Sequence, residues 1–379
     1  MTLHIMFVSE QAMPSLIPSL LTKNNEDRFF PARHVLFIAT QQMRQRAEWL
    51  SDALRPRGVS VEIYGIDGLA NDFEKLRQIL EDKFMEIDCR DPKKVVVNVT
   101  GGTKLMALMS FSIASALEWP IYYIDHQSDY ILWLHNKNMP SIPITFEGNI
   151  NVVMAAHGFT IASADRNPVA QNLRDLGEAL IDRHAEFADI LPTFNYLCME
   201  AEAKLNANIP QRMMGRRGFQ PLIQLFENAG LVKSLHGMTL CFPDEESRKI
   251  AAGGWLESYI YGKLYGLRGR QGNRALRDVA TNVNIAGSNG ARNEIDVAFL
   301  SGNHIGLIEC KARGLVNGEP AFTQDAIHKL KSLRDAGGKQ TYLYLCSYAP
   351  LSNAVVERAN QDGVKIISGG RLANIHTLL

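Results

Sequence analysis

Short apolar runs alternate with longer amphipathic segments over the first 148 residues. The apolar runs are rich in β-branched and aromatic residues and predict buried strands at 3–8, 35–39, 59–64, 95–99 and 121–124. The segments between them have helical periodicity at 42–54, 71–84 and 104–116. Alternating strands and helices are typical of a parallel sheet covered on both faces. We therefore expect an α/β, Rossmann-like domain over residues 1–148.

The pattern changes over residues 149–245. Residues 172–205 are helical with one polar face, and Pro192 and Pro210 interrupt this stretch. Residues 218–232 predict a helix that ends at Ala229-Gly230, and 233–242 predict two short strands. This order outlines a winged helix-turn-helix, although any small helical connector has a similar pattern. We expect a helical connector with a winged-helix-like segment.

A second α/β domain is expected over residues 246–379. A helix at 255–265 precedes a basic, glycine-containing segment. Two strands, 293–300 and 305–310, follow and are joined by a turn at 301–303. The remaining pattern predicts a helix, a strand, a helix and a strand at 324–336, 341–346, 352–362 and 364–367.

Composition excludes several classes of protein. The 379 residues exceed what one hydrophobic core accommodates, and 46% hydrophobic residues argue against disorder. No apolar run approaches the roughly 20 residues that span a bilayer, and the amino terminus lacks a secretion signal, so we expect a cytoplasmic protein without a membrane segment. The five cysteines are widely spaced without a CxxC, which indicates neither a disulfide framework nor a structural zinc.

The net charge of zero hides an uneven distribution. Residues 1–148 contain 15 basic and 18 acidic residues, 149–245 contain 8 and 11, and 246–379 contain 17 and 11. The last part has a cluster of arginines that could follow a phosphate backbone or simply be solvated: Arg268, Arg270, Arg274, Arg277 and Arg292. The charge therefore favours a nucleic-acid partner for the carboxy-terminal domain.

The hairpin at 293–310 carries the chemistry of that domain. Asp296 is on its first strand, and Glu309 and Lys311 share one face of its second strand. Charged residues beside apolar strands need compensation, which a divalent cation would supply. If the turn centres on Gly302, Asp296 faces Ile308, and we expect a register offset or a bulge to bring the two carboxylates together.

A hard cation such as Mg²⁺ or Mn²⁺ prefers oxygen ligands. We expect Asp296, Glu309 and the backbone carbonyl of Cys310 to bind the metal. Lys311 would assist the metal-bound water that attacks the substrate. Glu257, on the helix before the hairpin, would add a carboxylate. The alternative is an edge hairpin with a surface Glu-Lys pair. Gln324 is more typical of a solvated helix residue than of a phosphate contact.

Asp-x(12)-Glu-x-Lys after a helix-borne Glu resembles the PD-(D/E)XK nuclease superfamily, over about residues 246–379. The resemblance implies metal-dependent hydrolysis of phosphodiester bonds, with Glu257, Asp296, Glu309 and Lys311 as the catalytic residues.

A glycine-rich turn, Thr100-Gly101-Gly102-Thr103-Lys104, joins strand 95–99 to the next helix. Glycines let a ligand approach the backbone, and a helix amino terminus favours an anion. The turn is neither a P-loop nor a GxGxxG fingerprint. Since ligands of such sheets bind beyond the carboxyl ends of the strands, we add the polar residues that follow the other strands: Ser9, Gln11, Thr40, Gln42 and Asp125.

Asn98 to Lys104, together with Met106 and Ser9-Glu10-Gln11, resembles the signature of CARF domains, the CRISPR-associated Rossmann folds that sense cyclic oligoadenylates. The resemblance implies a homodimer that binds cyclic tetra-adenylate across its two CARF domains as an allosteric activator. The whole chain resembles a CARF nuclease of type III CRISPR defence. The implied activity is an endonuclease that cleaves DNA, with RNA left open.

Two alternatives stay open. One is a ligand-responsive regulator whose winged helix binds duplex DNA and whose nuclease domain is degenerate. Arg212, Arg216 and Arg217, just before the predicted winged helix, favour this alternative, and the net charge of −3 over 149–245 argues against it. The other is that the first domain cleaves its own cyclic ligand.

Overall fold

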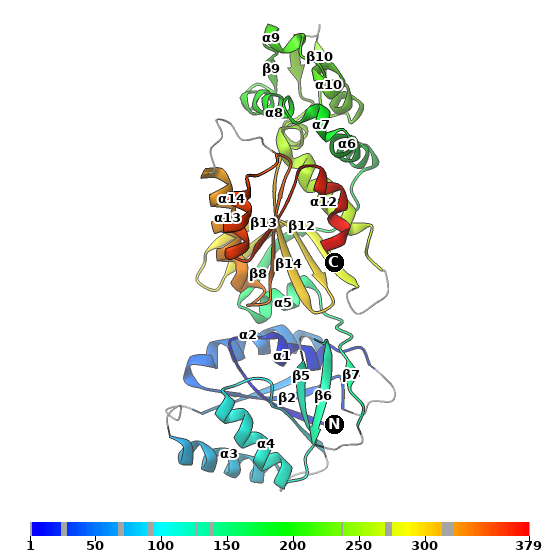
Figure 1. The fold of residues 1–379 in the computed structure, drawn as a ribbon. Helices are drawn as coiled ribbons and strands as arrows, with labels where there is room; N and C mark the ends of the chain where they lie inside the picture. The colour runs from blue at the N-terminus through cyan, green and yellow to red at the C-terminus, as the bar shows by residue number, and fades with distance from the viewer. Residues whose placement is uncertain are drawn as a thin grey trace.

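The computed structural model describes residues 2–23, 29–66, 72–88, 94–125, 128–135, 139–235, 238–269, 275–312 and 321–378. Three bodies follow one another along the long axis of the molecule: an amino-terminal sheet domain, a carboxy-terminal sheet domain and a helical module at the far end (Figure 1). The helical module therefore does not separate the two sheets. In the described part of the chain, no helix is long and apolar enough to cross a membrane.

The amino-terminal domain has a seven-stranded sheet in the order β3-β2-β1-β4-β5-β6-β7. Strands β1 to β5 pair in parallel, whereas β6 and β7 form an antiparallel edge. This arrangement confirms the expected parallel sheet, to which the structure adds β6 and β7. The strands are β1 Leu3–Phe7, β2 His34–Ala39, β3 Ser60–Gly65, β4 Val95–Asn98, β5 Ile121–Asp125, β6 Tyr130–His135 and β7 Ile142–Pro143.

Helices cover both faces of this sheet (Figure 1). Met6 of β1 and Val8, just after it, face one hydrophobic core with Leu50 of α2, while Ile5 faces a second core with Leu80 of α3. Alternate residues of each central strand are therefore buried on opposite sides, as a parallel sheet requires. The helices are α1 Met13–Leu16, η1 Ile17–Ser19, η2 Gln41–Met43, α2 Arg44–Leu54, η3 Arg55–Arg57, α3 Phe73–Asp88 and α4 Lys104–Ala116.

The carboxy-terminal domain has a six-stranded sheet in the order β16-β15-β14-β13-β12-β8. Strands β14, β15 and β16 are parallel, and the others are antiparallel. The strands are β8 Phe159–Asp165, β12 Leu276–Gly287, β13 Arg292–Ser301, β14 His304–Lys311, β15 Tyr342–Ser347 and β16 Val364–Ser368. The helices are α5 Ile150–Ala156, α12 Trp255–Tyr265, α13 Ala321–Leu333, η6 Arg334–Ala336, α14 Asn353–Gln361 and η7 Gly369–Leu378.

The helical module has the order of helices and strands that a winged helix has. Along the chain, α8 is followed by β9, then by α9 and α10, and then by β10 and β11. The three strands form a sheet in the order β10-β11-β9. Phe194 and Phe226 pack against each other in its core. The elements are α6 Gln171–Asp182, α7 His184–Phe187, α8 Leu191–Glu200, β9 Asn206–Asn208, α9 Gln211–Met214, α10 Phe219–Asn228, β10 Lys233–Leu235, β11 Thr239–Cys241, α11 Glu245–Lys249 and η5 Ile250–Gly254.

The expected connector, 149–245, is divided between two bodies. Its first part, α5 and β8, belongs to the carboxy-terminal sheet domain, where β8 pairs with β12. The chain leaves that domain after β8, builds the helical module and returns through α11, η5 and α12 (Figure 1). β12 was not expected, because Asp278, Asn282 and Asn284 interrupt its apolar pattern.

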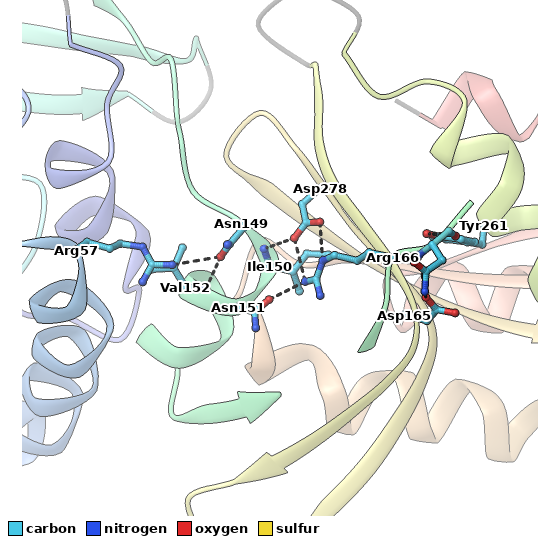
Figure 2. Close-up of polar contacts among 10 residues, drawn as sticks. Arg57, Asn149, Ile150, Asn151, Val152, Asp165, Arg166, Tyr261 and Asp278 are labelled. Carbon is cyan, nitrogen blue, oxygen red and sulfur yellow. Dashed lines mark hydrogen bonds and ion pairs between the residues drawn. The ribbon is translucent and has the colours of Figure 1, made fainter. Parts of the chain in front are cut away.

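A buried carboxylate ties the junction together (Figure 2). Asp278 of β12 is 8% exposed and accepts the N–H of Ile150, at the first turn of α5, at 3.0 Å. Arg166, just after β8, donates from Nε and Nη2 to the same carboxylate at 3.1 and 3.2 Å. Arg57 of the amino-terminal domain donates to Asn149, the residue that caps α5. Asp278 therefore fixes α5, which lies against the amino-terminal domain, to the carboxy-terminal sheet.

We expect Asp278→Ala to lower the free energy of unfolding by about 3 kcal/mol, since it leaves the Arg166 guanidinium without its carboxylate and the Ile150 N–H without an acceptor. Thermal unfolding followed by circular dichroism checks this. The matched control is Asn151→Ala, which removes one exposed hydrogen bond to Arg166 and should change stability by less than about 0.5 kcal/mol. Equal losses in the two variants would contradict the role given to Asp278.

Candidate active site and ligand site

Strands β13 and β14 separate where the predicted catalytic carboxylates lie. Their pairing runs from Ser301↔His304 to Val297↔Ile308, so the turn consists of Gly302 and Asn303. Gly302 adopts a φ of 58°, which suits a two-residue hairpin turn. The turn does not centre on Gly302, so Asp296 does not face Ile308. Continued by one residue, this register places Asp296 opposite Glu309, so the expected register offset, and not a bulge, brings the two carboxylates together.

Beyond the last paired residues of β13 and β14, a hydrogen bond from backbone to side chain connects the two strands. The backbone N–H of Cys310 donates to Asp296 Oδ2 at 2.7 Å. Asp296 and Glu309 are only 9% and 3% exposed. The strand ends therefore hold two buried carboxylates next to each other.

Two lysines compensate this negative charge. Lys311 Nζ lies 2.5 Å from Glu309 Oε1. Lys329 Nζ lies 2.5 Å from Glu309 Oε2 and 3.8 Å from Asp296 Oδ1. Lys329 was not among the predicted residues, because its helix α13 is separated from the hairpin in sequence and carries no motif. Gln324, the residue considered on this helix, precedes Lys329 by more than one turn.

Glu257 of α12 is close enough to Asp296 and Lys311 for their charges to act on it. Burial, and then the negative charge of Asp296, raise the pKa of Glu257 to about 8, against an opposing effect of Lys311. Burial and the charge of Glu309 raise the pKa of Asp296 to about 6. Burial by itself would lower the pKa of Lys311, but the charge of Glu309 and the hydrogen bond to it raise that pKa above its ordinary value. The site therefore has three acidic groups and two lysines, and burial favours a proton on Glu257.

A bend in the helix before the hairpin places Glu257 at the site. α11, η5 and α12 follow one another without a break, and Gly253 inside η5 has a φ of 151°. A Cβ on Gly253 would lie 3.4 Å from the Cβ of Ala312, just after β14. Glycine thus permits both the bend and the close approach of this helix to the end of β14.

One side of the site, with Glu257, Cys310 and Lys311, borders a cleft of about 1070 Å³ between the sheet domain and the helical module. Glu257, Glu294 and Lys311 line the wall that the sheet domain forms. The opposite wall comes from the helical module and is mainly acidic, with Glu202, Glu245, Glu246, Arg248 and Lys249. The winged-helix module therefore borders the active-site cleft.

The donor set suits a hard divalent cation. Among the described residues, no three His, Cys, Asp or Glu side chains come together as a metal site of their own. The predicted set uses two carboxylates, Asp296 and Glu309, with the Cys310 carbonyl as the third donor. All three donors are oxygens, which Mg²⁺ and Mn²⁺ prefer.

The predicted arginine cluster is only partly described. Arg268 stacks on the ring of Tyr265, with Cζ 3.5 Å from the ring centroid. Arg277 and Arg292 are exposed at the ends of β12 and β13. Arg270 and Arg274 lie outside the described residues.

The glycine-rich turn of the amino-terminal domain is closely packed. A Cβ on Gly101 would lie 2.1 Å from the carbonyl oxygen of Phe7, and Gly102 has a φ of 78°. Thr103 caps α4 by accepting the N–H of Met106 at 3.2 Å. Only glycines fit between the end of β1 and the start of α4, so the turn keeps its shape.

The predicted ligand residues differ in what they contact. Thr100 holds strands together, since its Oγ1 accepts the N–H of Ile124 at 2.8 Å. Thr103 and Lys104 are exposed. Asp125 accepts the hydroxyl of Ser128 at 2.6 Å, and Ser9 Oγ donates to the carbonyl of Gln11 at 3.2 Å.

Sheet topology brings the loops that carry these residues to one edge. Because β2, β1, β4 and β5 are parallel neighbours, the loops after all four strands lie at the same end of the sheet. Thr40 and Gln42, which follow β2, lie at this edge as well.

The edge that carries the predicted ligand residues contacts the carboxy-terminal domain directly. Glu10, between Ser9 and Gln11, pairs with Lys339 in the turn that leads into β15. Arg46 of α2 holds the loop by donating to the Glu10 carbonyl at 2.9 Å. A path of direct contacts therefore leads from the loop after β1 to the loop that joins α13 to β15.

Comparison with known proteins gives matches for both sheet domains. Residues 3–152 match the family model of the Card1 CARF domain, and residues 244–379 match the model of the Card1-like endonuclease domain. Among functionally curated protein sequences, none matches the chain.

Solved structures share the whole fold. Protein VC1899 from Vibrio cholerae is 25% identical with a TM-score of 0.87, over 100% of this chain and 96% of that one. Can2 from Sulfobacillus thermosulfidooxidans, solved with cyclic tetra-adenylate, is 23% identical with a TM-score of 0.77, over 100% and 98%. A type III CRISPR defence DNA nuclease activated by cyclic oligoadenylate is 19% identical with a TM-score of 0.58, over 93% and 47%.

The raised pKa of Glu257 predicts how stability changes with pH. Between about pH 4.5 and 8, the folded protein keeps a proton on Glu257 that the unfolded chain releases, so stability falls as pH rises. Glu257→Gln removes this titration. In metal-free protein, we expect the melting temperature of the variant to exceed that of wild type by about 2 °C more at pH 8 than at pH 5.

Scanning fluorimetry with EDTA at both pH values measures this difference. The control is Glu294→Gln, at an exposed position of the same cleft. This substitution should shift the melting temperature equally at pH 5 and at pH 8. A pH-independent difference for Glu257→Gln would contradict the burial of its charge.

Proposed function

Because the chain belongs to the Card1-like family, in which a CARF domain precedes an endonuclease domain, we propose that it is a metal-dependent endonuclease activated by cyclic tetra-adenylate. Its substrate is DNA, as single strands or as duplex that it nicks, with RNA as a second substrate to be tested. The observation that carries the proposal is the convergence of Asp296, Glu309 and Lys311 at the separating ends of β13 and β14.

Each residue of the site has a distinct role in this proposal. Asp296, Glu309 and the Cys310 carbonyl hold Mn²⁺ or Mg²⁺, which when bound lowers the pKa of its water and neutralises charge on the phosphate. Lys311, paired with Glu309, orients the attacking water. Glu257 supports the site as a further carboxylate. The cleft toward the helical module admits the nucleic acid.

The activator site rests on the turn from Thr100 to Lys104. The exposed Lys104 and the N–H groups at the start of α4 suit phosphate groups, while the net charge of −3 over residues 1–148 provides no general attraction. Can2, which shares the fold, was solved with cyclic tetra-adenylate. We place the ring at this edge, against the loops that carry Ser9, Gln11, Thr40, Gln42 and Asp125.

A homodimer is part of the proposal. Leu105, Leu108 and Phe111 are exposed apolar residues on α4, immediately beyond the turn. A second copy packed against this face would cover them and bring two turns together, so that one ring with repeated units could contact both.

The winged-helix topology favours one rival function, a ligand-responsive regulator that binds duplex DNA. The face of α10 that is free of the core is polar, with Gln220, Gln224 and Asn228 exposed. The assembled carboxylates and lysines argue for the nuclease instead. Duplex binding that needs no metal and survives Asp296→Ala, without cleavage by wild type, would favour the regulator.

We expect wild type to cleave labelled single-stranded DNA or nick plasmid when Mn²⁺ and cyclic tetra-adenylate are both present. Asp296→Ala and Lys311→Ala should lower the rate at least about 100-fold, because each removes a group from the reacting centre. Gel assays with cyclic tri-, tetra- and hexa-adenylate measure this. Lys365→Ala, at an exposed position of the same sheet, is the control. Wild-type rates in either site variant would contradict the assignment.

The ion pair between Glu10 and Lys339 should couple ligand binding to cleavage. Exposed ion pairs contribute about 0.2 to 1 kcal/mol, so we expect Lys339→Glu to change the ligand-dependent acceleration by up to about fivefold. The double variant Glu10→Lys with Lys339→Glu should restore most of it. Cleavage rates of wild type, the two single variants and the double variant, with and without ligand, form a double-mutant cycle. Ligand affinity is measured separately. Additive effects of the two substitutions would show that the pair does not couple the sites.

A further inference from the structure

Lys329 lies within ion-pair distance of both predicted metal ligands, Asp296 and Glu309. Its helix is held to the sheet by buried residues on both sides of it, Ala326, Ile327, Leu330 and Leu333. This anchoring directs the lysine to the strand ends, where Nζ contacts Glu309 Oε2 at 2.5 Å and Asp296 Oδ1 at 3.8 Å. Lys311 contacts the other oxygen of Glu309, Oε1, at 2.5 Å.

The position of Lys329 overlaps with the role of a metal. Two carboxylates that are almost fully buried need a positive charge nearby, because desolvation makes an unbalanced pair costly. The Lys329 side chain is 31% exposed and long enough to swing out. It can therefore neutralise Asp296 and Glu309 without being locked in place.

We propose that Lys329 is a second lysine of the nuclease site, acting as the counterion of Asp296 and Glu309 before metal binds and as a phosphate contact afterwards. This inference rests on the proposed metal-dependent function. A divalent cation and an ammonium group repel each other at one pair of carboxylates, so binding of the metal turns Lys329 away. The ammonium group is then available to a substrate phosphate that reaches the same two carboxylates.

The proposal assigns Lys329 opposite effects on two measurements. Removing its charge should tighten metal binding, because a competing cation is lost, and should slow cleavage, because a phosphate contact is lost. A lysine that only orients Asp296 and Glu309 would do otherwise: its loss would weaken metal binding and cleavage together. The sign of the change in metal affinity therefore separates the two roles.

The experiment is isothermal titration of the metal-free full chain with MnCl₂, in the absence of nucleic acid and cyclic nucleotide. We expect Lys329→Met to bind Mn²⁺ at least about fivefold more tightly than wild type. Lys331→Met is the matched control, since Lys331 lies on the same helix and pairs with Asp362, and its affinity should equal that of wild type. Circular dichroism spectra of the three proteins in EDTA that superimpose at the assay temperature show that the fold is kept.

Cleavage kinetics at saturating Mn²⁺ provide the second measurement. Lys329→Met should lower kcat/KM at least about tenfold, mainly through KM, and Lys329→Arg should recover part of the loss because it keeps the charge. Weaker or unchanged Mn²⁺ binding by Lys329→Met, with normal binding by wild type, overturns this inference alone. Failure of both proteins to bind Mn²⁺ overturns it together with the metal-dependent function.

Discussion

Two carboxylates that are buried side by side repel each other, and the nuclease half of the molecule is arranged around this repulsion. β13 and β14 bring Asp296 and Glu309 together where their ladder ends, and the Cys310 N–H stabilises one carboxylate. The groups that respond to this charge come from helices on opposite faces of the sheet: Glu257 from α12 and Lys329 from α13 (Figure 1). The site is therefore complete only when both helical layers are docked, which makes it sensitive to small movements of either layer.

The two sheet domains communicate through direct contacts, because the winged-helix module lies at the far end of the molecule (Figure 1). Asp278 fixes α5 to β12, and Asn149 at the start of α5 meets Arg57 of the sensor domain (Figure 2). The ion pair of Glu10 adds a contact at the ligand edge itself. A ligand at that edge thus has a short path to α13, through the loop that precedes β15.

Periodicity and local motifs predicted the parts of the molecule that are determined locally. The five parallel strands, α4 and α12 were predicted closely, because continuous apolar runs and amphipathic periods reflect burial on a sheet. β8 and β12 were missed, since Asp278 becomes acceptable in a strand only through Arg166 and Ile150, which are distant in sequence. Lys329 was missed for the same reason. Asp296 is offset by one residue from the register of a turn centred on Gly302, because the hairpin turn has two residues instead of three.

Insertion of the winged helix also orders the folding of the chain. β8 is synthesised before the inserted module, yet its partner β12 comes more than 100 residues later. The carboxy-terminal sheet therefore closes across a long loop, which slows its formation, whereas the strands of the sensor sheet are contiguous in the chain. During synthesis the amino-terminal domain can fold first. The half of the molecule that would detect the signal is thus in place before the half that would cut nucleic acid exists.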